Sequence, residues 1–290
     1  MTAFLQYVAG GLAAGSLYGL AALGLTLIYK TTGVVNFAHG EMAMVSTFVA
    51  YILLTAYHVP YSAAFLGALV FAALLGVVVE RVFMRRIQSA SVLSQIMVTL
   101  GLFLVLNGAM STRFFEALPF PQPIGGSPLN LGGVFVSADS LVVFALTAAI
   151  MLGLYLFFRY TLLGVALRAT AQNLSVARLM GVRVGRVYAT TWGVGAVLGA
   201  VAGMLIAPTT ALYPSFMGDV AIKAFASAIL GGLGSLPGAV IGGLLLGVLE
   251  NLIAGYISTE LKAVFAFSLI LLVLVLRPEG IMGAPVRRRI

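Results

Sequence analysis

Residues 268–276 of the 290-residue chain read Ser-Leu-Ile-Leu-Leu-Val-Leu-Val-Leu, a run that is apolar on every side. The strands of a membrane β-barrel alternate apolar and polar residues, so this run is not typical of a barrel. Outward from it, 61% of the chain is hydrophobic and 8% is charged, whereas a soluble domain carries about a quarter charged residues. The sequence therefore predicts an all-α polytopic membrane protein.

Apolar runs of the same kind recur along the chain and predict further helices. The predicted helices cover residues 4–29, 36–56, 61–79, 93–111, 140–158, 188–207, 219–232, 237–255 and 260–276. Because a spanning helix needs roughly 20 mostly apolar residues, we expect about eight to nine transmembrane helices, including broken or re-entrant segments. We expect the chain, 1–290, to form a single transmembrane domain, with the short run 219–232 as the candidate for re-entry.

The basic residues are distributed unevenly between the segments that connect these helices. If the N-terminus lies outside, 13 of the 16 basic residues fall on the inner side, and an excess of Lys and Arg marks the cytoplasmic side. The inner set is Lys30, Arg81, Arg85, Arg86, Arg159, Arg168, Arg178, Arg183, Arg186, Arg277, Arg287, Arg288 and Arg289. The bias predicts an outer N-terminus and a cytoplasmic C-terminus, and it explains the net charge of +8 without nucleic acid.

The two longest connecting segments differ in character. Residues 112–139, predicted outside, contain four of the ten prolines and several glycines, which predicts an irregular extracytoplasmic loop. Residues 159–187, predicted inside, keep a helix-like pattern between their arginines. We expect a short cytoplasmic surface helix in this second segment.

The sequence offers no constellation of catalytic or metal-binding residues. There is no cysteine, and two histidines are too few for a metal cluster. No serine has a matching base, and no carboxylate pair has a spacing that suggests hydrolysis. No glycine is followed by lysine, so the Walker pattern for ATP is absent. We expect a chain that is not an enzyme and holds no cofactor of its own.

Glycines recur at four-residue spacing in three of the predicted helices. The rows are Gly11, Gly15 and Gly19; Gly195, Gly199 and Gly203; and Gly243 and Gly247. In lipid, small residues of this kind let two helix backbones approach closely. We expect packing inside one subunit, and the alternative is a face that meets a partner subunit.

A first polar island, residues 33–41, separates two apolar runs. Gly33 suits the left-handed cap of the first helix, and Asn36 can cap the next one. His39 and Glu41 are not explained by helix ends and fall in the first turns of the second helix, where ionisable groups are expensive. Either they brace the inner ends of helices, or they belong to a gate or pathway.

A second island, residues 231–239, is rich in glycine. Ser235 shortly before Pro237 predicts a helix start, and Gly234 lies in the preceding break, so the string is a helix-break-helix element. Because broken helices can mark a transport site built from half-helix ends, Gly234 and Ser235 are also candidates for a pathway or gate.

Three charged residues lie in the seventh and eighth predicted helices. Asp219 and Lys223 are four residues apart, a spacing that permits a helical ion pair. Glu250 falls near the outer end of the eighth predicted helix, where it either lines a cavity or reaches the interface.

The inner segment contains a third motif, residues 166–181. Asn173 or Ser175 can start a short helix, and Leu174, Ala177 and Gly181 share one face of it. A charged loop on anionic lipid explains the flanking arginines but not this apolar face. The pattern favours a docking helix for a cytoplasmic partner.

These strings resemble the LivH-like permease subunits of branched-chain amino-acid ABC importers. The resemblance rests on Gly33–Glu41 (GVVNFAHGE) followed by Met42, on Arg168–Gly181 (RATAQNLSVARLMG) and on Gly231–Gly243 (GGLGSLPGAVIGG). The three strings occur in the family's order and at similar separations. The match therefore covers nearly the whole chain.

The resemblance implies a permease that carries branched-chain or other hydrophobic amino acids across the bacterial inner membrane. It implies a second related permease, two cytoplasmic ATPases that use ATP and Mg, and an extracytoplasmic solute-binding protein. The inner helix looks like the family's coupling helix, which assigns coupling to Arg168, Gln172, Asn173, Leu174, Arg178 and Gly181. The candidates for the pathway or gate are Asn36, His39, Glu41, Gly234, Ser235 and Glu250.

Three alternatives stand beside this hypothesis. Permeases for urea or short amides look similar, and these strings do not separate the substrates. A stand-alone secondary transporter needs an intramembrane relay of ionisable groups, for which the chain offers only His39, Glu41 and Glu250. A membrane-embedded enzyme lacks a nucleophile or metal constellation.

Overall fold

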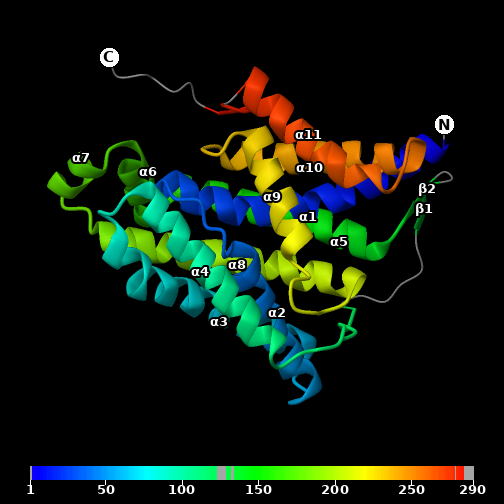
Figure 1. Cartoon of the computed structure of the whole chain (residues 1–290), viewed down its shortest axis with the longest axis horizontal. Helices are drawn as coiled ribbons and strands as arrows, with labels where there is room; N and C mark the ends of the chain where they lie inside the picture. The colour runs from blue at the N-terminus through cyan, green and yellow to red at the C-terminus, as the bar shows by residue number, and fades with distance from the viewer. Residues whose placement is uncertain (1, 123–128, 132–133, 278, 284–290) are drawn as a thin grey trace. The chain divides into compact units, whose positions relative to one another are not determined.

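The computed structural model describes residues 2–122, 129–131, 134–277 and 279–283, and most of that part of the chain is helical (Figure 1). The elements are α1 (Thr2–Thr32), α2 (His39–Thr55), α3 (Tyr61–Val82), the 3-10 turn η1 (Met84–Ile87), α4 (Val92–Ser111), β1 (Leu129–Leu131), β2 (Val134–Val136), α5 (Ala138–Tyr160), α6 (Leu162–Gln172), α7 (Leu174–Leu179), α8 (Val184–Thr210), α9 (Gly218–Gly231), α10 (Leu236–Tyr256) and α11 (Leu261–Leu276).

The nine predicted helices are all present, and the inner segment adds α6 and α7. Six described helices are long and apolar enough to cross a membrane: α1, α3, α4, α5, α8 and α10. Helix α9 has 14 residues and is therefore about 21 Å long at 1.5 Å per residue, less than a hydrocarbon core of about 30 Å. The all-α polytopic fold is confirmed, and by this length α9 is too short to span without its neighbouring segments.

The predicted outer segment, 112–139, lies only partly in the described structure. Its described part includes the antiparallel pair β1 and β2, in which Leu129 lies opposite Val136. The amide of Gln6 makes two 2.8 Å hydrogen bonds with the backbone of Phe135, which attach β2 to the start of α1. The glycines expected to make this loop irregular, Gly125, Gly126, Gly132 and Gly133, lie outside the described residues, as do the inner arginines Arg287, Arg288 and Arg289.

The chain forms two compact units, each assembled from separated segments. The first unit comprises Met1–Thr26, Gln122–Ile150 and Val220–Ile290, and the second comprises Leu27–Pro121 and Met151–Asp219. Helices α1 and α5 contribute to both units, and α9 belongs almost wholly to the first.

The first unit is held together by two of the predicted glycine rows. A Cβ atom at Gly15 of α1 would lie 2.6 Å from the carbonyl oxygen of Gly243 on α10, and one at Gly11 would lie 2.5 Å from Cα of Val248. These distances leave no room for a side chain, so the two backbones are in direct contact, as small residues permit in lipid. For these rows the prediction of packing inside one subunit is confirmed.

The helix-break-helix element predicted at residues 231–239 is also present in the first unit. Helix α9 ends at Gly231, and the hydroxyl of Ser235 caps α10 by accepting from the backbone N–H of Gly238 at 3.1 Å. The segment after α11 returns to this break, where the N–H of Ile281 donates to the carbonyl of Leu230 at 2.9 Å. That bond satisfies a carbonyl that the end of a helix leaves without a partner.

The second unit is built around α8, which packs against α2 and α3. A Cβ atom at Gly203 of α8 would contact the side chain of Thr47, and one at Gly76 of α3 would overlap the backbone of Trp192. The third predicted glycine row therefore also serves packing within the subunit, at Gly199 and Gly203, where α8 meets α2. Close approach on two sides buries most of α8.

Candidate functional site

Helix α7 is the short helix predicted in the inner segment, and local signals set both of its ends. The side-chain oxygen of Asn173 accepts hydrogen bonds from the N–H groups of Ser175 and Val176, each at 3.1 Å. Gly181 follows the helix with a φ of +81°, a conformation that favours glycine. Asn173 and Gly181 thus start and stop the helix, as their residue types predict.

The two faces of α7 have different surroundings. Ala177 is buried, and Leu174 packs against a cluster on α6 and α8. That cluster contains Leu167, Val184, Val187 and Tyr188. On the opposite face Val176, Leu179 and Met180 are exposed by 52%, 87% and 79%. An exposed apolar patch of this kind marks a surface that another molecule can cover.

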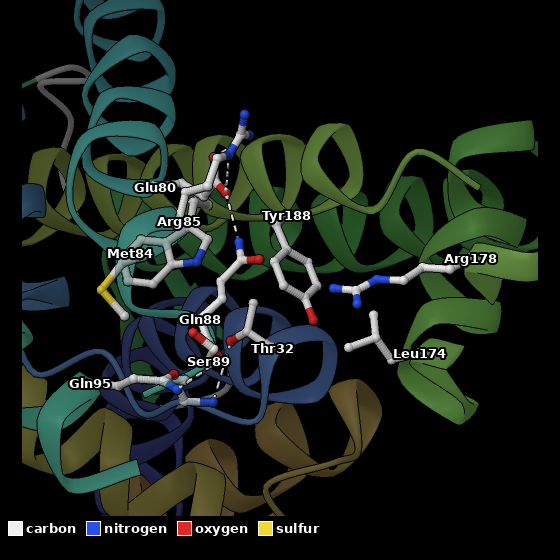
Figure 2. Close-up of a pocket in the computed structure, with 12 residues that line it drawn as sticks. Thr32, Glu80, Met84, Arg85, Gln88, Ser89, Gln95, Leu174, Arg178 and Tyr188 are labelled. Atoms are coloured by element: carbon white, nitrogen blue, oxygen red, sulfur yellow. Dashed lines mark hydrogen bonds and ion pairs between the residues drawn. The ribbon is translucent and has the colours of Figure 1, made fainter. Parts of the chain in front are cut away.

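A cavity of about 470 Å³ lies behind α7, within the second unit (Figure 2). It is lined from the end of α1 and the residues after it, the end of α3 with η1 and the residues that follow, and the beginnings of α4, α7 and α8. Leu174 and Arg178 are the two α7 residues in its wall. These residues therefore face into the cavity, on the side of α7 away from the exposed apolar patch.

One wall of the cavity carries an ion pair between a buried carboxylate and a partly exposed arginine. The carboxylate of Glu80, at the end of α3, receives both Nε and Nη2 of Arg85, at 3.2 and 2.7 Å. The same Nη2 donates to the backbone carbonyl of Gly185 at 2.7 Å, and the amide of Gln88 donates to Glu80 at 3.4 Å. This set of bonds ties the end of α3 to the start of α8.

A second wall presents groups that donate hydrogen bonds. Figure 2 shows Arg178 reaching from α7 toward Tyr188 of α8, with the Tyr188 hydroxyl directed into the cavity. Tyr188 is 8% exposed, and its ring belongs to the cluster beneath α7. The other predicted coupling residues, Arg168 and Gln172, are exposed on α6 and lie outside this lining.

The polar residues of the first island are buried at the start of α2. The amide of Asn107 on α4 donates to Glu41 Oε2 at 3.3 Å and to the Ser215 hydroxyl at 2.7 Å. The imidazole of His39 lies against Gly199, where a Cβ atom would come within 3.1 Å of the ring. This arrangement links α2 with α4 and α8, and it favours the bracing hypothesis over a gate.

Asn36 differs from its predicted role. It was expected to cap the second helix, but the helix begins after Ala38, and no side chain caps it. Asn36 Oδ1 instead accepts from the N–H of Ala38 at 3.1 Å. Its side chain therefore closes a turn before the helix, because α2 begins at His39, three residues after Asn36.

Glu250 is buried inside the first unit, and it takes the place of Asp219 as the partner of Lys223. Lys223 Nζ is 2.6 Å from Glu250 Oε1 and 3.2 Å from the Tyr18 hydroxyl. The ion pair at Lys223 therefore joins α9 to α10 rather than using Asp219, one turn earlier on the same helix. Lys262 lies 3.9 Å from the same Glu250 oxygen. Gly234, the other candidate of this region, sits in the α9–α10 break with open space beside it.

Several residues of these sites were missed from sequence. Arg85 was counted among the basic residues attributed to membrane orientation, and Glu80 was not singled out. Asn107 and Tyr188 fell within predicted apolar helices. The signal available for Glu80 was an acid followed five residues later by an arginine at a helix end. Among the described residues, no group of three or more His, Cys, Asp or Glu side chains could hold a metal ion.

The chain is similar in sequence to permease components of known transport systems. Residues 7–275 match the family of permease components of branched-chain amino-acid transport systems. The high-affinity branched-chain amino-acid transport system permease protein LivH of Salmonella typhimurium is 37% identical, with 97% of this chain and 96% of that protein covered. LivH of Escherichia coli K12 and BraD of Pseudomonas aeruginosa are each 36% identical over the same shares. The solved complex PsaBC from Streptococcus pneumoniae with Fab resembles the fold, with a TM-score of 0.51, 17% identity, and 95% and 92% of the two chains covered.

Proposed function

The chain belongs to the branched-chain amino-acid permease family, and we propose that it carries branched-chain or other hydrophobic amino acids across the inner membrane as the permease subunit of an ATP-driven importer. The observation that carries this proposal is the family match over residues 7–275, nearly the whole length of a multi-pass membrane protein. Its relatives are transport subunits and not enzymes. Because the chain has no Walker sequence, ATP and Mg belong to partner chains.

The proposed assembly contains a second related permease, two cytoplasmic ATPases and an extracytoplasmic solute-binding protein. This division of labour is supported by composition, since the chain offers neither a nucleotide-binding sequence nor a large outer segment. A stand-alone transporter is less well supported, because Glu41 and Glu250 are engaged in bonds within their own units.

Uptake into proteoliposomes that contain the whole importer tests the proposed function. We expect leucine uptake that requires ATP on the ATPase side and the loaded binding protein outside. Urea and acetamide serve as alternative substrates in the same vesicles. ATP-dependent uptake of urea or acetamide without leucine uptake would replace the amino-acid assignment, and leucine uptake without ATP would contradict an ATP-driven importer.

The proposed orientation places α7 in the cytoplasm and the segment before α5 outside. It is supported by the bias of the basic residues toward one side. Because the chain lacks cysteine, single cysteines at Ser137 and Ser175 can be labelled without background. We expect a membrane-impermeant thiol reagent to reach Ser137→Cys from outside and Ser175→Cys only in inverted vesicles. Labelling of both from one side would overturn the orientation.

We assign contact with an ATPase to the outer face of α7. Val176, Leu179 and Met180 form an exposed apolar patch on a helix whose other face is packed, and such a patch suits a groove in a partner. Asn173 and Gly181 set the ends of this helix, so their role in coupling is to position the patch. Leu174 and Arg178 face the cavity instead.

A matched pair of variants tests this surface. Leu179→Asp places a charge on the patch, whereas Leu162→Asp makes the same change at a residue of α6 that is 90% exposed. We expect Leu179→Asp to insert normally and to lose ATPase stimulation by the loaded binding protein, with Leu162→Asp close to wild type. Normal stimulation in Leu179→Asp would remove the patch from the coupling interface.

A further inference from the structure

The cavity behind α7 contains hydrogen-bonding groups that the packing of the second unit does not use. Polar cavities inside membrane domains usually serve a ligand or an ion pathway, and a volume near 470 Å³ lies in the range of small-molecule sites. Arg85 is already committed to Glu80 and to Gly185. The chemical class of a ligand therefore depends on the other polar side chains of the wall, which have hydrogen-bonding groups without a partner in the described structure.

Arg178 and Tyr188 supply donors on the α7 side of the cavity (Figure 2). Among the described lining residues, Arg178 is the cation without a carboxylate at ion-pair distance, since Glu80 is paired with Arg85. The Tyr188 side chain is more than nine-tenths buried, and no described residue bonds its hydroxyl. A guanidinium fork beside a hydroxyl donor suits a planar carboxylate.

Gln88, which follows η1, and Gln95 of α4 supply acceptors in the cavity wall. The amide nitrogen of Gln88 donates to Glu80 at 3.4 Å, and that of Gln95 donates to the carbonyl of Ala90 at 3.0 Å. No described residue donates a hydrogen bond to either amide oxygen, so each side chain retains that oxygen as an acceptor in the cavity wall. Two such oxygens, with the carboxylate of Glu80 nearby, suit an ammonium group.

The remaining lining contains the apolar residues Val34, Met84, Leu174 and Trp192 beside the hydroxyl residues Thr32 and Ser89. The cavity thus combines donors for a carboxylate, acceptors for an ammonium and four apolar residues that can contact a hydrophobic side chain. We propose that it binds one free α-amino acid with an apolar side chain. That the ligand is the transported cargo rests on the proposed function, whereas the chemical class rests on the lining alone.

Binding there has a consequence for α7. A ligand held by Arg178 and Leu174 on α7 and by Tyr188 on α8 adds a further contact between this six-residue helix and the body of the second unit. If α7 meets the ATPase, an amino acid that accumulates on its side fixes the helix and slows further import. The site is therefore one of product inhibition.

The single tryptophan of the chain provides the measurement, because Trp192 lies in the cavity wall. We expect leucine to change the Trp192 fluorescence of the purified full-length chain in a saturable way. Arg178→Gln is expected to weaken leucine binding roughly tenfold or more, through loss of a charge-assisted hydrogen bond. Tyr188→Phe is expected to weaken it roughly fivefold. Arg168→Gln removes an exposed arginine outside the lining and serves as the matched control, with unchanged affinity.

Two ligand analogues and a lipid distinguish the chemistry. Leucinamide lacks the carboxylate, and 4-methylpentanoate lacks the ammonium, so both are expected to bind more weakly than leucine. Vesicles with and without phosphatidylglycerol show whether an anionic headgroup takes the site. A response to phosphatidylglycerol without a response to millimolar leucine would overturn the proposal, as would equal leucine affinity in wild type and Arg178→Gln.

Uptake by the whole importer separates this proposal from the proposed function. ATP-driven leucine uptake with no leucine response of Trp192 would refute the cavity site and leave the permease assignment standing. A Trp192 response that depends on Arg178, in an assembly that does not import leucine, would refute the cargo assignment and keep the site. If the importer takes up leucine and Trp192 also responds to it, leucine on the α7 side is expected to lower the ATPase rate in wild type but not in Arg178→Gln. An unchanged rate in wild type would overturn product inhibition.

Discussion

Two buried carboxylates, one in each unit, are neutralised in different surroundings. Glu250 in the first unit lies 2.6 Å from Lys223, whose side chain is 16% exposed, with the Tyr18 hydroxyl as a further partner. Glu80 in the second unit lies 2.7 Å from Arg85, whose side chain is 42% exposed and borders the cavity. The bond lengths are nearly equal, so the surroundings of the cations distinguish the two pairs.

The difference separates a closed region from an open one. Around Glu250, the glycine rows of α1 and α10 bring backbones into contact, and α9 packs across the same unit. Glu80, by contrast, borders the cavity behind α7, whose lining includes side chains from five α-helices. The first unit is therefore organised for tight packing, and the second unit contains the candidate ligand site and the helix proposed to meet the ATPase.

The largest effect is expected where the first unit is most tightly closed. Gly15→Leu forces a side chain into the backbone of Gly243 and Leu244, where a Cβ alone would lie within 2.6–2.8 Å. Overpacking a well-packed core by a methylene or more costs about 1–3 kcal/mol. Here the atoms in the way are backbone atoms, which cannot rotate aside as a side chain can, so we expect the cost of Gly15→Leu to exceed that range. We expect little or no folded protein by size-exclusion chromatography in detergent.

Gly101→Leu is the matched control, because α4 has nothing within 4 Å of a Cβ at that position. It is expected to accumulate as wild type does. Similar losses in the two variants would show that the close contact between α1 and α10 is not what makes Gly15 necessary.

The next effect concerns the closed ion pair. Lys223→Met leaves Glu250 buried with a charge, and breaking a buried pair costs about 3–5 kcal/mol. We expect a fall of roughly 10 °C in apparent Tm, with much of the loss recovered in Lys223→Met/Glu250→Met because no unpaired charge remains.

Lys262→Met removes a cation 3.9 Å from the same oxygen, but from a side chain that is 48% exposed. Exposed pairs contribute about 0–1 kcal/mol, so little change is expected. A double variant no more stable than Lys223→Met would show that lost packing, and not the stranded carboxylate, causes the damage.

The sequence predicted what depends on neighbouring residues. Asn173, Gly181 and Ser235 were expected to start or stop helices, and they do so, because caps use atoms a few residues away. The glycine rows predicted close packing, although not that α1 would meet α10. The fold class and the helix positions were predictable for the same reason, since each apolar run carries its own signal.

Tertiary contacts were not predictable in this way. Lys223 had a candidate partner one turn away, yet it pairs with a residue 27 positions on, because α10 presents a buried carboxylate to α9. The cavity was missed since its walls come from segments far apart in the chain. One clue was available: Leu174 and Arg178 are four residues apart and share a face, so an inward Leu174 implies an inward Arg178.

Of the two buried carboxylates, the one in the open pair is expected to lose less when its main partner is removed. Arg85→Met removes the main partner of Glu80, but the amide of Gln88 still donates to that carboxylate, and the adjacent cavity has room for water. Because hydration replaces part of the lost interaction, we expect a loss of about 1–2 kcal/mol, well below that of Lys223→Met when Tm is measured in the same detergent. The hydrogen bond from Arg85 to the carbonyl of Gly185 also disappears. This adds to the loss of stability in Arg85→Met, which we still expect to be smaller than that in Lys223→Met. If Arg85→Met and Lys223→Met lower Tm equally, water does not reach Glu80 from the cavity, and its carboxylate is as inaccessible to solvent as that of Glu250.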